Sequence, residues 1–159
     1  MYKTILVPHA GTPAGDEALN HAIHAAKGEV PAKIILLHVV EEMQRPPSFG
    51  LSSTEREDLL KSIDEANQSI REEMQKEIEK KTSSCKENNI ESKTIVTIGD
   101  VSQVIMDTIR QESVDLVVMA KRRKLKGMKK LLSLGSVSRK IVENATCPVL
   151  LIDSEKKQH

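Results

Sequence analysis

The pattern that most restricts the fold of this chain is an alternation of short apolar runs with longer amphipathic stretches. Five runs rich in β-branched and apolar residues alternate with four stretches whose apolar residues recur every three or four positions. The second run, KIILLHVV at residues 33–40, is apolar on both faces, which is typical of a central parallel strand covered by helices on each side. The alternation therefore predicts a doubly wound α/β fold with a parallel sheet.

The limits of the elements follow from the same pattern together with Gly, Pro and capping residues. Residues 41–54 hold Pro46, Pro47 and Gly50 and are predicted to form a loop. A long helix then begins near Ser53 or Thr54, either of which could cap it. We expect strands at 4–8, 33–40, 92–98, 114–119 and 148–152, and the other helices at 14–27, 101–112 and 136–144.

A strand order of 3-2-1-4-5 would place the first strand at the centre of this sheet. In doubly wound sheets, ligands collect beyond the carboxyl ends of the strands at the point where the strand order reverses. That point would lie between strands 4–8 and 114–119, so the turn after the first strand would face the loop after the fourth. The sequence predicts a binding crevice there.

Length and composition favour one domain. The 159 residues, 38% apolar and 30% charged, suit a single globular unit over 1–159, with 154–159 as a flexible tail. No apolar run approaches the ~20 residues of a membrane span, and the apolar part of MYKTILVPHAG is too short for a signal peptide. We therefore expect a cytoplasmic protein, with Cys85 and Cys147 as buried free thiols.

The charge is concentrated in one segment. Residues 121–130 carry seven Lys and Arg, so the rest of a chain with net charge +1 carries −6. This basic loop precedes Gly135 and Ser136, which open a helix whose free N–H groups and positive dipole end attract anions. Ser136 and Ser138 would add hydroxyl donors. Cationic phosphate contacts are predicted from four residues, Lys121, Arg122, Arg123 and Lys124.

No catalytic group can be recognised. The five His are scattered, none beside a nucleophile or a carboxylate pair in the sequence, and no Cys/His group has metal-ligand spacing. His38, inside a strand, is interpreted as a hydrogen-bonded strand residue and not as a base. We expect a binding or regulatory protein without a metal; slow ATP hydrolysis is not indicated.

Several motifs resemble universal stress protein domains. ILVP at residues 5–8, followed by a Gly-Thr turn and DEALNHAI, is similar to the opening of that family. TIGDVSQVIMDTI followed by VDLVVMA resembles its next strand–helix–strand unit. LLSLGSVSRKIVENATCPVLLI, residues 131–152, is the most specific part of the match, which covers nearly the whole chain.

The resemblance implies a flavodoxin-like fold and, in one subgroup, ATP or another adenine nucleotide at the crevice. It also implies a homodimer through antiparallel pairing of the last strand, residues Val149, Leu150, Leu151 and Ile152. Base and phosphate contacts carried over from the family fall on Pro8, Ala10, Thr12, Val40, Met119, Ala120, Gly135, Ser136, Val137 and Ser138.

Two departures from the family pattern weaken the nucleotide prediction. The nucleotide-binding subgroup has Gly-x-x-Gly after the fourth strand, but here Ala120 replaces the first glycine and Arg123 or Leu125 the second. Ala10 replaces an Asp in the turn after the first strand. Losing one hydrogen bond to a charged group costs roughly 1.5–3 kcal/mol, so affinity would fall by about one to two orders of magnitude.

Three functions remain open at this stage. The first is a nucleotide-binding regulatory dimer, and the second a dimer that acts as an interaction scaffold without nucleotide. The third is polyanion or nucleic-acid binding by residues 121–130, which is disfavoured because the single Phe and single Tyr lie elsewhere. The apolar stripe of the long helix, from Leu59 to Ile78, predicts core packing, or a helix extending past the sheet towards a partner.

Overall fold

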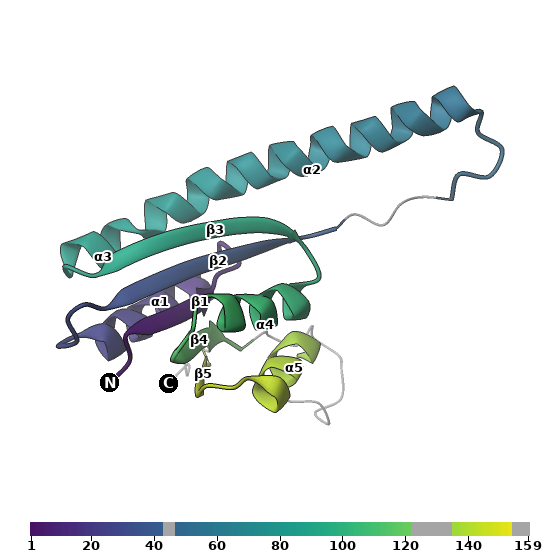
Figure 1. Cartoon of the computed structure of the whole chain (residues 1–159). Helices are drawn as coiled ribbons and strands as arrows, with labels where there is room; N and C mark the ends of the chain where they lie inside the picture. The colour runs from purple at the N-terminus through teal and green to yellow at the C-terminus, as the bar shows by residue number, and fades with distance from the viewer. Residues whose placement is uncertain (43–46, 122–134, 154–159) are drawn as a thin grey trace, which may run out of the picture.

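The computed structural model describes residues 1–42, 47–121 and 135–153. They form one parallel sheet in the order β3-β2-β1-β4-β5, with β1 at its centre (Figure 1). The predicted fold class and strand order are confirmed. The strands are β1 (Thr4–Pro8), β2 (Lys33–Glu41), β3 (Glu91–Gly99), β4 (Leu116–Ala120) and β5 (Val149–Ile152).

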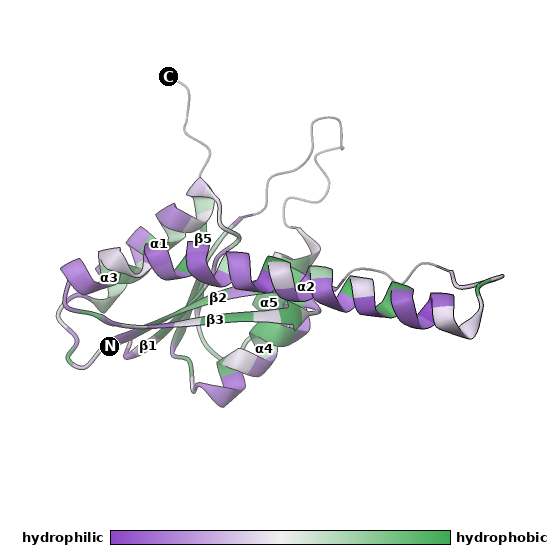
Figure 2. Cartoon of the chain, turned by 90° about the horizontal axis from the view of Figure 1, so that it is seen from above, coloured by the Kyte–Doolittle hydropathy of each residue, from purple (hydrophilic) through white to green (hydrophobic). Residues whose placement is uncertain are grey.

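Helices cover both faces of the sheet (Figure 2). One apolar cluster joins α1, α2 and α3 to one face, and a second joins α4 and α5 to the other. Alternate residues of β2 divide between the clusters, since Leu36 belongs to the first and Leu37 to the second. The helices are α1 (Pro13–Ala26), α2 (Ser53–Lys81), α3 (Ser83–Glu87), α4 (Val101–Gln111) and α5 (Ser136–Asn144).

The long helix α2 has 29 residues, so its axis is about 43 Å long and extends well past the sheet (Figure 1). Its cap is Ser52, one residue earlier than predicted, because Ser52 and Glu55 form a reciprocal capping box. Ile78, near its C-terminal end, is fully buried, whereas Ile70 is 40% exposed. The predicted stripe is therefore core only where the helix lies over β2 and β3.

Two further boundaries differ from the sequence prediction. The short helix α3 interrupts the strict alternation and places Cys85 in the core, while Cys147 is only partly buried. The fourth strand begins at Leu116 and not at Val114, because the Val114 N–H still bonds back to the Ile109 carbonyl at the end of α4. Asp115 then accepts hydrogen bonds from the backbone N–H groups of residues 3 and 4, which fixes the start of β4 against β1.

Within the described residues, no helix has the length and apolar character needed to cross a membrane. The basic residues beyond Lys121 and the predicted tail at 154–159 lie outside the described residues.

Candidate functional site

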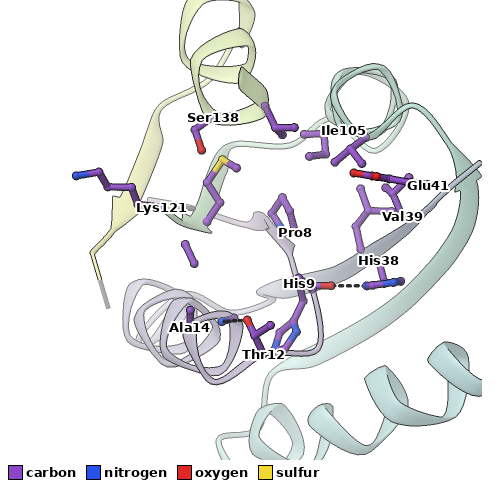
Figure 3. Close-up of a pocket in the computed structure, with 17 residues that line it drawn as sticks. Pro8, His9, Thr12, Ala14, His38, Val39, Glu41, Ile105, Lys121 and Ser138 are labelled. Atoms are coloured by element: carbon purple, nitrogen blue, oxygen red, sulfur yellow. Dashed lines mark hydrogen bonds between the residues drawn. The ribbon is translucent and has the colours of Figure 1, made fainter. Parts of the chain in front are cut away.

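A cavity of about 570 Å³ opens at the carboxyl end of the sheet, at the predicted crevice (Figure 3). Its volume is within the range of small-molecule sites. The ends of β1, β2 and β4, the start of α1, and parts of α4 and α5 form its walls. The lining residues are Pro8, His9, Ala10, Thr12, Ala14, Gly15, Leu37, His38, Val39, Glu41, Val101, Ile105, Met119, Ala120, Lys121, Val137 and Ser138.

The turn between β1 and α1 forms one wall, and its backbone is tightly constrained. Gly11 has a φ of +79°, which favours glycine, and Thr12 caps α1 by accepting a hydrogen bond from the Gly15 N–H at 3.3 Å. Gly15 lies so close to His9 that an added Cβ would stand 2.7 Å from the imidazole ring. The wall needs glycine at both positions.

His9 holds this turn from the inside. Its side chain is fully buried; Nδ1 accepts from the Gly11 N–H at 2.9 Å, and Nε2 donates to Asp16 Oδ1 at 3.0 Å. Lys81, at the end of α2, donates to the same carboxylate at 3.0 Å. Because both ring nitrogens are engaged, the imidazole is a structural tie and has no nitrogen available to act as a base on a ligand.

The pKa values of this cluster follow from burial and hydrogen bonding. Desolvation lowers the pKa of His9 below its usual value, even though Asp16 favours the charged form. Burial raises the pKa of the Asp16 carboxyl, but hydrogen bonds from Lys81 and His9 outweigh that effect and hold the pKa below its usual value. At neutral pH the cluster therefore contains a neutral imidazole, a carboxylate and an ammonium group.

His38 fixes the same turn from β2. Its Nδ1 lies 2.8 Å from the backbone oxygen of His9 and donates to it (Figure 3). The prediction that His38 is a hydrogen-bonded strand residue is confirmed, and the ring also lines the cavity.

The start of α5 forms the opposite wall. Gly135 occupies the N-cap position, and no side chain caps the helix, so the N–H groups of the first turn are left to water or a ligand. Ser138 is 2% exposed and lines the cavity with Val137. This wall combines backbone donors, a hydroxyl and the positive end of the helix dipole.

One ammonium and one carboxylate stand on opposite sides of the cavity (Figure 3). Lys121 follows β4 and makes an ion pair with Asp153 at 3.6 Å. Glu41 ends β2. A second, smaller cavity of about 390 Å³ adjoins the first and shares three lining residues with it. The second cavity is lined by Glu41, Glu42, Gly99, Asp100, Val101, Ser102, Ser136, Val137 and Lys140.

The structure brings together most of the residues carried over from the family, although no ligand is present to test their roles. Eight line the main cavity: Pro8, Ala10, Thr12, Met119, Ala120, Lys121, Val137 and Ser138. Ser136 faces the second cavity. Val40 and Gly135 line neither cavity; Val40 packs in the core with Leu36, on the α1 and α2 face. Arg122, Arg123 and Lys124 lie outside the described residues.

Sequence reasoning missed the polar residues that tie the walls together or change the cavity's charge. The expectation that no His has a carboxylate partner was wrong for His9, because the turn after β1 folds Asp16 back onto its ring. The expectation that the crevice offers mainly cations was incomplete, since Glu41 also lines it. A strand ending directly at the crevice was the available signal for Glu41. No group of His, Cys, Asp and Glu suited to a metal ion occurs among the residues the structure covers.

Comparison with known proteins identifies the family. Residues 1–153 match the sequence profile of the Universal stress protein family. The chain belongs to the universal stress protein family. Over 158 residues it is 30% identical to universal stress protein MJ0531 of Methanocaldococcus jannaschii, a match that covers 99% of this chain and 86% of that protein. It is also 30% identical to universal stress protein YxiE of Bacillus subtilis, over 96% of this chain and 99% of that one.

Solved structures of this family share the fold. The hypothetical protein MJ0577 superimposes with a TM-score of 0.78 at 24% identity, covering 98% of this chain and 99% of that one. A universal stress protein from Arabidopsis thaliana solved with AMP bound has a TM-score of 0.53 at 19% identity, covering 95% and 91%. A universal stress protein in complex with cAMP has a TM-score of 0.59 at 15% identity, covering 96% and 97%.

Proposed function

We propose that this universal stress protein is a regulatory binding protein that takes an adenine nucleotide, ATP or AMP, in the cavity between β1 and β4. The observation that carries the proposal is the cavity of about 570 Å³ at the reversal of strand order, faced by the uncapped start of α5. Two family structures hold AMP and cAMP, which supports the same ligand class here.

The walls of the cavity suit the parts of a nucleotide. Apolar side chains such as Val39, Ile105 and Met119 offer contact area for a planar base. The N–H groups at the start of α5, the Ser138 hydroxyl and the Lys121 ammonium suit phosphate. Because Ala10 and Ala120 replace an Asp and a Gly of the nucleotide-binding subgroup, we expect an affinity nearer to millimolar than to micromolar.

Thermal unfolding with added nucleotide tests this function. A ligand at a hundred times its Kd stabilises the folded state by about 2.7 kcal/mol, and each 1 kcal/mol raises the Tm of a domain of about this size by roughly 2–4 °C. AMP, ADP or ATP at 10 mM should therefore raise the Tm by a degree or more. Adenosine without phosphate should give a smaller shift. No shift with any of the three nucleotides would refute the proposed function.

We further propose that the protein forms a homodimer through β5. This strand lies at the edge of the sheet, next to β4 alone, and Leu150 is 40% exposed. An edge strand presents unpaired backbone groups that a second copy can pair with. Leu150→Lys should then give monomers in analytical ultracentrifugation, and an unchanged dimer would exclude β5 as the interface.

A scaffold function without nucleotide is the second candidate, and the part of α2 that extends past the sheet favours it. Adenine nucleotide released from denatured, carefully purified protein would count against this candidate. Polyanion binding by residues 121–130 is a third, and it requires an affinity that falls steeply with salt. The cytoplasmic location stays a prediction.

A further inference from the structure

The main cavity has two chemically different ends. Among its described lining residues, Glu41 is the only carboxylate and Lys121 the only ammonium, and they lie on opposite sides (Figure 3). Ser138 and Val137, at the start of α5, complete the side that favours anions. The other side, around Glu41, is formed by apolar residues of β2 and α4, among them Val39, Val101 and Ile105.

Glu41 is positioned to contact a ligand. As the last residue of β2, it follows Leu37 and Val39 on the same face of the strand, the face that packs against α4. Its side chain is exposed, and its carboxylate has no hydrogen-bond or ion-pair partner among the described residues. In Figure 3 it projects towards Ile105 at the cavity wall. A carboxylate only accepts hydrogen bonds, so it requires a donor.

A phosphate group cannot satisfy Glu41, because two negative charges repel each other strongly at a partly dehydrated site. The nucleoside half of a nucleotide has neutral donors: the ribose hydroxyls and the exocyclic amino group of the base. Ala10 leaves the turn after β1 without a carboxylate, so within the described residues Glu41 is the cavity's only charged acceptor for such a donor.

We propose that Glu41 accepts a hydrogen bond from the nucleoside half of the bound nucleotide and thereby determines which nucleosides the site selects. This inference rests on the proposed nucleotide-binding function. The ribose hydroxyls and the amino group share the chemistry that Glu41 requires, an uncharged O–H or N–H donor. A hydrogen bond to a charged acceptor is worth about ten- to a hundredfold in affinity.

The test is isothermal titration of AMP, ADP and ATP into the wild-type chain and Glu41→Gln, which removes the charge and keeps the size. Glu41→Gln should weaken all three nucleotides by a similar factor, about tenfold, and Glu41→Ala should weaken them further. Glu42→Gln is the matched control: its neighbouring exposed side chain borders only the second cavity, so binding should not change.

Two analogues show which donor Glu41 reads. If Glu41 contacts the sugar, 2′-deoxy-AMP binds the wild type and Glu41→Gln equally; if it contacts the amino group, IMP does so. Either result supports the proposal.

Tighter or unchanged AMP binding by Glu41→Gln would overturn the inference while leaving the proposed function intact. The same holds for an effect that changes with the number of phosphates, since Glu41 would then face the phosphate end. If the wild type bound none of the three nucleotides, the proposed function itself would fail, and this inference with it.

Discussion

The two walls of the cavity satisfy their polar groups in opposite ways. In the β1–α1 turn, the protein's own side chains satisfy the polar atoms: His9 joins Gly11 to Asp16, Lys81 joins Asp16 to α2, and His38 holds the His9 carbonyl. At the start of α5, Gly135 provides no side-chain cap, and the backbone donors face outward. The first wall is built for stability and the second for ligand, so substitutions in the two walls should affect different measurements.

The largest expected effect is on stability, from His9→Ala. The substitution removes a fully buried ring and leaves the Gly11 N–H without its acceptor, so unfolding should require about 3 kcal/mol less. Urea denaturation followed by circular dichroism measures the change. The control is His21→Ala on the exposed side of α1, which should alter stability by less than about 0.5 kcal/mol. Equal effects of the two variants would show that the turn is not held by His9.

Gly15→Ala should come next. The new Cβ would stand 2.7 Å from the His9 ring, so either the ring or α1 must move, at a cost of about 1–3 kcal/mol. The same denaturation experiment checks the result. Ala at Gly28, whose Cβ would meet nothing within 4 Å, separates this crowding from backbone effects, although its φ of +87° adds strain of its own. A neutral or stabilising Gly15→Ala would contradict the packing described here.

The pH dependence of stability should reveal His9 as well. Its pKa is lowered in the folded state, so the unfolded chain binds the proton first as pH falls. The contribution is therefore complete above about pH 6.5 and is lost as pH falls from there through the lowered pKa. Asp16 and Lys81 face the ring and stay charged in this range, while His38 opposes a second positive charge there. His9→Gln should flatten the slope between pH 6.5 and 5; an identical slope would assign it to other groups.

The smallest effect should come from the α5 wall and should appear only with ligand. Ser138→Ala removes one hydroxyl, which is worth about 0.5–1.5 kcal/mol, or a few-fold in affinity for AMP. Stability without ligand should change less than for His9→Ala, because Ala fits a helical position. Parallel titration and denaturation separate the two effects. A variant that loses stability but binds AMP normally would reverse the proposed division between the walls.

Local pattern was enough to predict much of the fold. The apolar runs at β1 and β2 and the capping signal of α5 follow from periodicity and turn residues, so the order of elements and the place of the crevice could be predicted. The start of α2 was misplaced by one residue because Ser52, Ser53 and Thr54 are all good caps, and only the pairing of Ser52 with Glu55 decides among them. The short helix α3 left no clear periodic signal.

The site was harder to predict because its ties join residues distant in sequence. Lys81 lies 65 residues from Asp16, and His38 lies 29 residues from the His9 carbonyl it binds. Neither distance carries a local signal, so these contacts depend on how α2 and β2 pack against the turn. The apolar lining from α4, such as Ile105, was predicted only as core, because a strand-end cavity takes its walls from the same side chains that fill the core.

The central claim, that an adenine nucleotide occupies this cavity, is tested most directly by an NMR titration. With increasing AMP, backbone amide signals of Met119, Val137, Ser138 and Glu41 should shift together along one saturation curve, while those of β3 and the distal part of α2 stay in place. Shifts confined to residues outside the cavity, or no saturable shift at 10 mM AMP, would contradict the account.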